Sequence, residues 1–171
     1  TKVVRLLLSK SDIDINKAAD YGGVTALYIA SWKGHAEIVR LLLSKSDIFI
    51  NKANDNGVTA LHTASQHGHV EVVQLLLSKS DIDINKATYD GRTALYVASN
   101  NGHLEVVRLL LSKSDIDINK AMNDGSTALY VASQFGNVEV IRLLLSKSGI
   151  DINKAMNDGA TALFAASQEG H

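Results

Sequence analysis

The chain repeats one order of apolar and polar residues with a period of 34 residues. The segment 93–126, TALYVASNNGHLEVVRLLLSKSDIDINKAMNDGS, aligns with 25–58, 59–92 and 127–160. Between 93–126 and 127–160, 27 of 34 positions are identical. A fixed period of roughly 20–50 residues indicates a solenoid or array. The fold can therefore be predicted from one copy and multiplied.

Each copy begins with two short helical patterns. In 93–102 a Thr precedes the apolar residues, and its hydroxyl suits the free N–H groups of a first helical turn. Ala94 and Ala98 share a face on which a second helix can approach closely. Gly102 predicts a left-handed cap at the end of this helix. A second helix from His103 to Leu111 is apolar around most of its circumference, so we expect neighbouring helices to enclose it.

The rest of the copy predicts an extended segment and a turn. Residues 114–119, SDIDIN, alternate polar and apolar with the period of a strand. Asn123, Asp124 and Gly125 predict a tight hairpin turn, because Asp-Gly tolerates positive φ. Such a unit cannot bury its apolar faces alone, whereas stacked copies can. We therefore predict an all-α solenoid of helix-turn-helix units joined by β-hairpin-like loops.

We expect a single domain over residues 1–171, because a repeat array of this length can bury a continuous core. A half copy at 1–24 precedes four full copies at 25–58, 59–92, 93–126 and 127–160, and a half copy at 161–171 follows. The loop at 20–23 is one residue longer than its equivalents, since Leu8 and Leu43 are 35 positions apart and later intervals are 34.

Both end copies present apolar residues where a neighbouring copy would cover them. These residues are Val3, Val4, Leu6 and Leu7 at the start and Leu163, Ala165 and Ala166 at the end. Read from end to start, the chain gives EGH-TKVVRLLL, an uninterrupted copy. With no initiator Met, this favours a fragment of a longer array. The alternative is end-to-end self-association through uncapped terminal repeats, a contact that could propagate.

Composition argues against several kinds of partner and chemistry. A net charge of −1 gives no field for polyanions, so we expect neither nucleic acid nor membrane as partner. No apolar run approaches the roughly 20 residues of a membrane span. The chain has no cysteine, which excludes disulfides and thiolate chemistry. No signal peptide is visible, and although the sequence does not determine the compartment, we expect an intracellular, cytoplasmic protein.

The segments TALY, NNGHLEVVRLLL and DIDIN, in this order and spacing, resemble the ankyrin repeat, and the resemblance recurs in every copy. The tetratricopeptide repeat has the same period, but its tryptophan–tyrosine–proline signature is missing here. The resemblance implies an ankyrin-repeat stack. It also implies that partners bind to the concave face, which is formed by the hairpin loops and the inner helices.

Three departures from the family pattern affect the details. Ala replaces Pro at the first helical position in every copy, which loses a preset φ without breaking the helix. Ser-Lys-Ser-Asp replaces the glycine-containing end of the second helix, so Ser and Asp are expected to satisfy backbone groups there. The pattern's His is kept only at His62 and is replaced at Tyr28, Tyr96, Tyr130 and Phe164.

Candidate catalytic and metal-binding groups favour structural roles. His62, His67 and His69 form the only histidine cluster, but His62 and His69 occupy structural positions of the family pattern. The aspartates of DIDIN recur along the array, as expected of a solvated face, and the glycines are turn residues that form no phosphate loop. We therefore predict no enzyme activity and no catalytic, metal-binding or cofactor-binding residue.

Positions that differ between copies form the candidate binding surface, although neutral drift would also produce differences. They precede the helix-ending glycine, form the hairpin tip, or precede the Thr that starts the first helix. Several are aromatic or Arg, types that concentrate interface energy. Phe49 breaks the DIDIN alternation and either extends this surface or contacts the first loop. The predicted partner-binding residues are Tyr21, Trp32, Lys33, Asn56, Gln66, His67, Tyr89, Arg92, Asn100, Asn101, Asn123, Gln134 and Phe135.

The sequence thus predicts a non-catalytic module that binds a protein partner on its concave face. The alternative is a structural spacer in a longer array, selected for stacking and not for contacts. Which protein is bound cannot be deduced from these residues.

Overall fold

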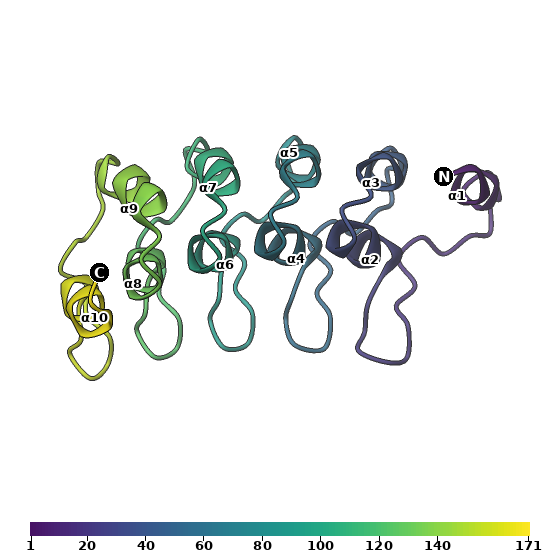
Figure 1. Ribbon diagram of the computed structural model, residues 1–171. Helices are drawn as coiled ribbons and strands as arrows, with labels where there is room; N and C mark the ends of the chain where they lie inside the picture. Colours follow the sequence, from purple (N-terminus) through teal and green to yellow (C-terminus); the bar gives the residue numbers. More distant parts are fainter.

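A computed structural model describes all 171 residues as ten short helices without a β-strand. The inner helices, α2 (Ala26–Trp32), α4 (Ala60–Gln66), α6 (Ala94–Asn100), α8 (Ala128–Gln134) and α10 (Ala162–Glu169), form one row (Figure 1). The outer helices, α1 (Lys2–Leu7), α3 (Ala36–Leu43), α5 (Val70–Leu77), α7 (Leu104–Leu110) and α9 (Val138–Leu145), form a second row above it. The predicted all-helical stack is confirmed.

Local sequence signals set the helix ends close to their predicted places. The Thr before each inner helix accepts a hydrogen bond from the N–H three residues later, as Thr93 does from Tyr96 at 3.1 Å. Gly102 follows α6 with a φ of 69°, which is the left-handed cap. The outer helix α7 is shorter than predicted by one residue at each end, because His103 is its N-cap and Leu111 its C-cap.

The glycine between the two helices of a copy also allows the next copy to approach. Gly68 has a φ of 70°, and a Cβ on it would lie only 2.8 Å from Nδ1 of His103. The His103 ring uses this space to place Nε2 3.0 Å from the Gln66 carbonyl, to which it donates. In the following copy Asn137 takes this role and donates to the Ser99 carbonyl at 2.8 Å. Each copy thus satisfies free carbonyls at the end of the preceding inner helix.

Apolar side chains from successive copies form one continuous core that runs from Ile15 to Ala162. Leu76 and Leu110, on two successive outer helices, are fully buried. Leu7 occupies the same position on α1, where no earlier copy covers it, and it is 51% exposed. Burial of this leucine therefore comes from the neighbouring copies, and the predicted enclosure of the second helix is confirmed.

The predicted strand at SDIDIN is wrong. Residues 114–119 form turns, because an asparagine of the preceding copy holds their backbone. Asn85 donates through Nδ2 to the Asp115 carbonyl at 2.6 Å and accepts through Oδ1 from the Asp117 N–H at 2.8 Å. These backbone groups are therefore not free for a β-ladder. The same two bonds are made by Asn16, Asn51 and Asn119, and we call these four residues the asparagine ladder.

The predicted hairpin turn is confirmed, with positive φ confined to glycine. The Met122 N–H donates to the Ser126 carbonyl at 2.9 Å, and Gly125, with a φ of 91°, donates to the Met122 carbonyl at 3.0 Å. The longer first loop accommodates its extra residue with two positive-φ glycines, Gly22 and Gly23. We call residues 19–24, 54–58, 88–92, 122–126 and 156–160 the hairpin loops.

Serine ends the outer helices as predicted, but aspartate does not contribute. The Ser112 hydroxyl donates to the Leu109 carbonyl at 2.7 Å, and the serines at the equivalent position of the other copies do the same. The carboxylate of Asp115, the aspartate of Ser-Lys-Ser-Asp, accepts no hydrogen bond. The next aspartate, Asp117, accepts from the Asn119 N–H at 3.1 Å, further along the chain. One hydroxyl therefore satisfies a helix end that usually relies on glycine.

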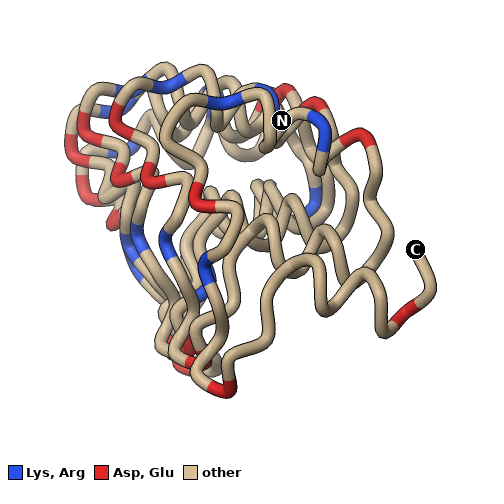
Figure 2. The backbone as a smooth tube through the Cα atoms, turned by 90° about the vertical axis from the view of Figure 1, so that its left-hand side faces the viewer, with Lys and Arg blue, Asp and Glu red and all other residues tan.

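Basic and acidic residues run in separate rows along the array (Figure 2). Each hairpin loop carries one exposed aspartate: Asp20, Asp55, Asp90, Asp124 or Asp158. Arg92 is the only basic residue within these loops. The loop edge is therefore acidic although the whole chain is nearly neutral.

Replacing Leu110 by Ala should lower the free energy of unfolding by about 2–5 kcal/mol, because it leaves a cavity in the core. The matched control is Leu7→Ala, at the same position of a copy with one face uncovered, which should cost less than about 1 kcal/mol. Urea unfolding followed by circular dichroism measures both. Equal losses for the two variants would contradict burial by neighbouring copies.

Candidate functional site

None of the predicted partner-binding residues is buried. In the hairpin loops, Tyr21 and Tyr89 are 94% and 75% exposed. At the ends of inner helices, Phe135 is 55% exposed and Trp32 is 39% exposed. Asn100 and Gln134 are half-buried, and the other predicted residues are exposed. All of them are thus accessible from the face that the hairpin loops and inner helices form.

Trp32 lies in a cluster that spans two copies. Its Nε1–H donates to Nε2 of His67 at 3.2 Å, and Nδ1 of His67 in turn donates to the Thr63 carbonyl at 2.9 Å. The Lys33 ammonium lies 3.8 Å from the centroid of the indole ring. The His69 ring stacks on that of His67, with centroids 6.0 Å apart. The indole is therefore held in one orientation by predicted residues of both copies.

Three other predicted residues line one hollow of about 310 Å³ between the second and third hairpin loops and helices α4 and α6. They are Asn56, Gln66 and Arg92. The remaining lining residues are Val58, His62, Thr88, Asp90 and Val97. We call this hollow the Arg92 pocket. It is large enough for one or two side chains.

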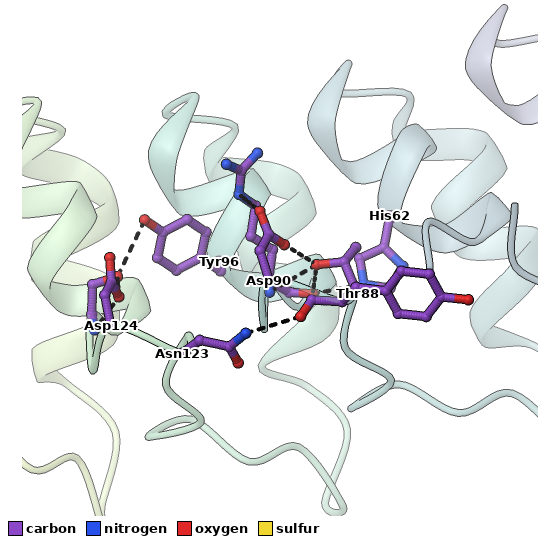
Figure 3. A network of polar contacts seen from close by, with 9 residues as sticks. His62, Thr88, Asp90, Tyr96, Asn123 and Asp124 are labelled. Carbon is purple, nitrogen blue, oxygen red and sulfur yellow. Dashed lines mark hydrogen bonds and ion pairs between the residues drawn. The ribbon is translucent and has the colours of Figure 1, made fainter. Parts of the chain in front are cut away.

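The Arg92 side chain is oriented by its own hairpin loop. Its Nε lies 3.0 Å from Oδ2 of Asp90, and Oδ1 of Asp90 accepts the hydroxyl hydrogen of Thr88 (Figure 3). Burial acts to raise the pKa of the Asp90 carboxyl, but the Thr88 hydroxyl and the Arg92 charge outweigh it, so the pKa lies below its ordinary value. Asp90 is therefore ionised at neutral pH and pairs with Arg92.

The backbone of Arg92 is held from the preceding copy by His62. The His62 Nε2–H donates to the Arg92 carbonyl at 3.0 Å. Its Nδ1 accepts from the Thr59 N–H at 3.2 Å, so a capping box closes at the start of α4. The bond from Thr59 requires the neutral ring, because protonated Nδ1 cannot accept a hydrogen bond. Burial lowers the pKa of His62, and the bonds to backbone groups offset this only in part.

Two further predicted residues make contacts of other kinds. Asn123 donates through Nδ2 to the Tyr89 carbonyl at 2.9 Å and so joins the third and fourth hairpin loops (Figure 3). Asn101 donates to the Val97 carbonyl of its own helix at 2.7 Å. Six of the thirteen predicted residues therefore gather at the Trp32 cluster and the Arg92 pocket. The other seven lie outside both: Tyr21, Tyr89, Asn100, Asn101, Asn123, Gln134 and Phe135.

Sequence reasoning did not single out Thr88 or Tyr96 as site residues. Thr88 differs from its equivalents Ala19, Asn54, Met122 and Met156, so the comparison between copies contained this signal. Tyr96 is half-buried beside a hairpin loop, with its hydroxyl 3.5 Å from the Ser126 Oγ and facing Asp124 (Figure 3). Its position as the third residue of α6, directly above the hairpin loops, could have indicated this location.

Phe49 lies away from both groups of predicted residues. Its side chain is 63% exposed and lies with Asp14, Lys17 and Lys52 around a hollow at the base of the first two loops. Its N–H donates to Oδ1 of Asn16. This position fits the second interpretation, a local contact near the first loop, rather than an extension of the binding surface. Phe49 lies beside residues 14–18, which precede that loop.

His, Asp and Glu side chains nowhere come together in groups of three or more that could hold a metal ion. None of the helices combines the length and the apolar character needed to cross a membrane.

A family model described as ankyrin repeats (3 copies) matches residues 47–122 and 117–171. A second model, ankyrin repeats (many copies), matches residues 1–43. The chain belongs to the ankyrin-repeat family. A comparison with curated proteins gives no match. Ankyrin repeats are generally protein–protein interaction modules and typically non-catalytic.

His62 should make the stability of this ankyrin-repeat array depend on pH. Because its pKa is lowered in the folded state, the unfolded chain binds the proton more readily. The stabilisation is therefore complete above the ordinary pKa of 6.5 and is lost as the pH falls below it.

His62→Tyr should remove that loss, since Tyr occupies the position in three other copies. The measurement is the free energy of unfolding of both proteins at several pH values from about 7 to about 5. The other five histidines are common to both proteins, so the difference isolates His62. Parallel curves would show that the His62 ring does not titrate differently on folding.

Proposed function

We propose that this ankyrin-repeat chain is a non-catalytic module that binds a protein partner on its concave face, through the partner-binding residues predicted above. One observation carries the proposal: residues that differ between nearly identical copies are accessible on the hairpin loops and the inner helices. In contrast, the leucines of the outer helices recur unchanged and pack into the core. Differences that concentrate at accessible positions of loops and helix ends are expected of a recognition surface.

The fixed orientation of Trp32 supports the same proposal. A side chain that is already held by His67 and Lys33 loses little conformational freedom when a partner covers it. Tryptophan is also among the residue types that contribute most to interface energy. Phe135, exposed three copies further along, would provide a second apolar contact on the same face.

Trp32→Ala and Phe135→Ala should each weaken partner binding by about 1–3 kcal/mol while leaving thermal stability unchanged. The partner is first captured in cells by cross-linking from a photoreactive residue at Gln134, and affinities are then measured with the purified partner. Arg108→Ala, on outer helix α7, is the matched control and should bind like the wild type. Binding that survives both aromatic substitutions would refute recognition by this face.

A spacer that associates end to end is the second candidate. Val3 and Leu6 on α1 and Leu163 on α10 are 69%, 67% and 77% exposed, so the apolar faces of the first and last helices are open in this chain. A second copy could cover them by continuing the stack.

A cytoplasmic location and the division of the chain into the units given above also remain predictions.

End-to-end association should appear in sedimentation velocity as a sedimentation coefficient that rises steadily with protein concentration. Leu6→Lys, which places a charge on the open face of α1, should abolish the rise. A single species with the mass of one chain at every concentration would exclude this candidate.

A further inference from the structure

The residues that make the Arg92 pocket unlike its neighbours come from separate places in the sequence. Three positions of this pocket carry a residue type that no other copy has at the equivalent position: His62, Thr88 and Arg92. Arg92 corresponds to Val24, Val58, Ser126 and Ala160. In the structure His62 and Thr88 each bond the backbone of Arg92. One pocket of the array therefore has a chemistry that no other copy repeats.

The end of the Arg92 side chain has hydrogen-bonding groups without a protein partner. Asp90 pairs with Nε, and no other side chain of the protein bonds the guanidinium. Both Nη groups therefore remain free, in the planar arrangement that binds a carboxylate through two parallel hydrogen bonds. The amides of Asn56 and Gln66 line the same pocket and also make no side-chain hydrogen bond. All three groups can donate to one acceptor.

The Arg92 guanidinium is also fixed before any ligand arrives. His62 holds the carbonyl of Arg92, the Thr88 hydroxyl accepts from its N–H at 2.9 Å, and Asp90 holds Nε. The backbone of Arg92 is therefore held by His62 and Thr88, and its guanidinium by Asp90. Because such a group loses little freedom on binding, its free donors are suited to recognition.

We propose that the Arg92 pocket binds one acidic side chain, a Glu or Asp carboxylate, of the protein partner. This rests on the proposed function, since it assigns the chemistry of one contact on the concave face. The carboxylate bridges the two Nη groups of Arg92, and the amides of Asn56 and Gln66 donate to its remaining lone pairs. The pocket thereby fixes the register of the partner along the array.

The neighbouring hairpin loops restrict the partner further. Asp90 in the pocket itself, and Asp55 and Asp124, exposed on the loops before and after Arg92, would repel a second carboxylate placed beside the first. A partner segment rich in acidic residues is therefore disfavoured, and a single acid flanked by neutral or basic residues fits.

The test uses peptides as probes. Random 12-residue peptides displayed on phage are selected on the wild-type chain, and enriched sequences are synthesised with an amidated C-terminus, so that only side-chain carboxylates are tested. Each is also made with its acidic residue changed to the corresponding amide. Fluorescence anisotropy then gives affinities for the wild type, Arg92→Gln, Arg92→Lys and the control Arg108→Gln. Arg108 is a half-exposed arginine paired with Glu105 on α7.

The enriched peptides should share one acidic residue. Its change to the amide should weaken binding to the wild type about tenfold to a hundredfold, the range of a charge-assisted hydrogen bond. The same change should have no effect on Arg92→Gln, because the two losses are not additive for groups in contact. Arg92→Lys should retain little of the affinity, since it keeps the charge without the planar fork. Arg108→Gln should bind like the wild type.

Three outcomes count against the proposal, and they differ in what else they overturn. Enriched peptides without an acidic residue, or equal binding to the wild type and Arg92→Gln, overturn the pocket alone if Trp32→Ala still weakens binding. Insensitivity to Trp32→Ala and Phe135→Ala as well overturns the proposed function itself. A selection that enriches no peptide counts against both.

Discussion

The packing of each copy against the next is the constraint on which the structure depends. The comparison of Leu110 with Leu7 isolates it, because the two leucines have the same sequence context but differ in what lies beside them. A single helix pair of this kind could not exclude water from its leucines, and a run of copies does so along its whole length. Since burial of apolar area is the main favourable contribution to folding, the outer helices have little freedom to vary.

Polar contacts between copies add direction to this packing. The ring of His103 bonds the backbone of the copy before it, and each Asn of the asparagine ladder bonds the backbone of the copy after it, so every junction is bonded from both sides. These bonds specify the spacing of the copies, which apolar packing alone would leave adjustable. The face formed by the hairpin loops and the inner helices is therefore a surface on which variation does not disturb the core. The Arg92 pocket illustrates this, because its special residues replace side chains that the core does not use.

Much of the fold could be predicted from single residues whose effect is local. The threonine caps and the positive φ of Gly102 follow from chemistry within one copy. The error at SDIDIN arose because an alternating pattern was taken as a strand, whereas Asn85 of the copy before bonds that backbone. For the candidate site, the comparison of copies found accessible positions. It could not predict which of them meet, because the bonds of Trp32 to His67 and of His62 to Arg92 depend on the rise and rotation between copies.

The asparagine ladder has a consequence for how such a chain can change over time. Every Asn of the ladder binds the backbone of the following copy, and the partner groups are main-chain atoms that any copy supplies. Duplication or loss of one whole copy would therefore restore the same bonds at the new junction. Recombination between copies could lengthen, shorten or reorder the array, and with it the set of side chains presented to a ligand, without redesigning the frame.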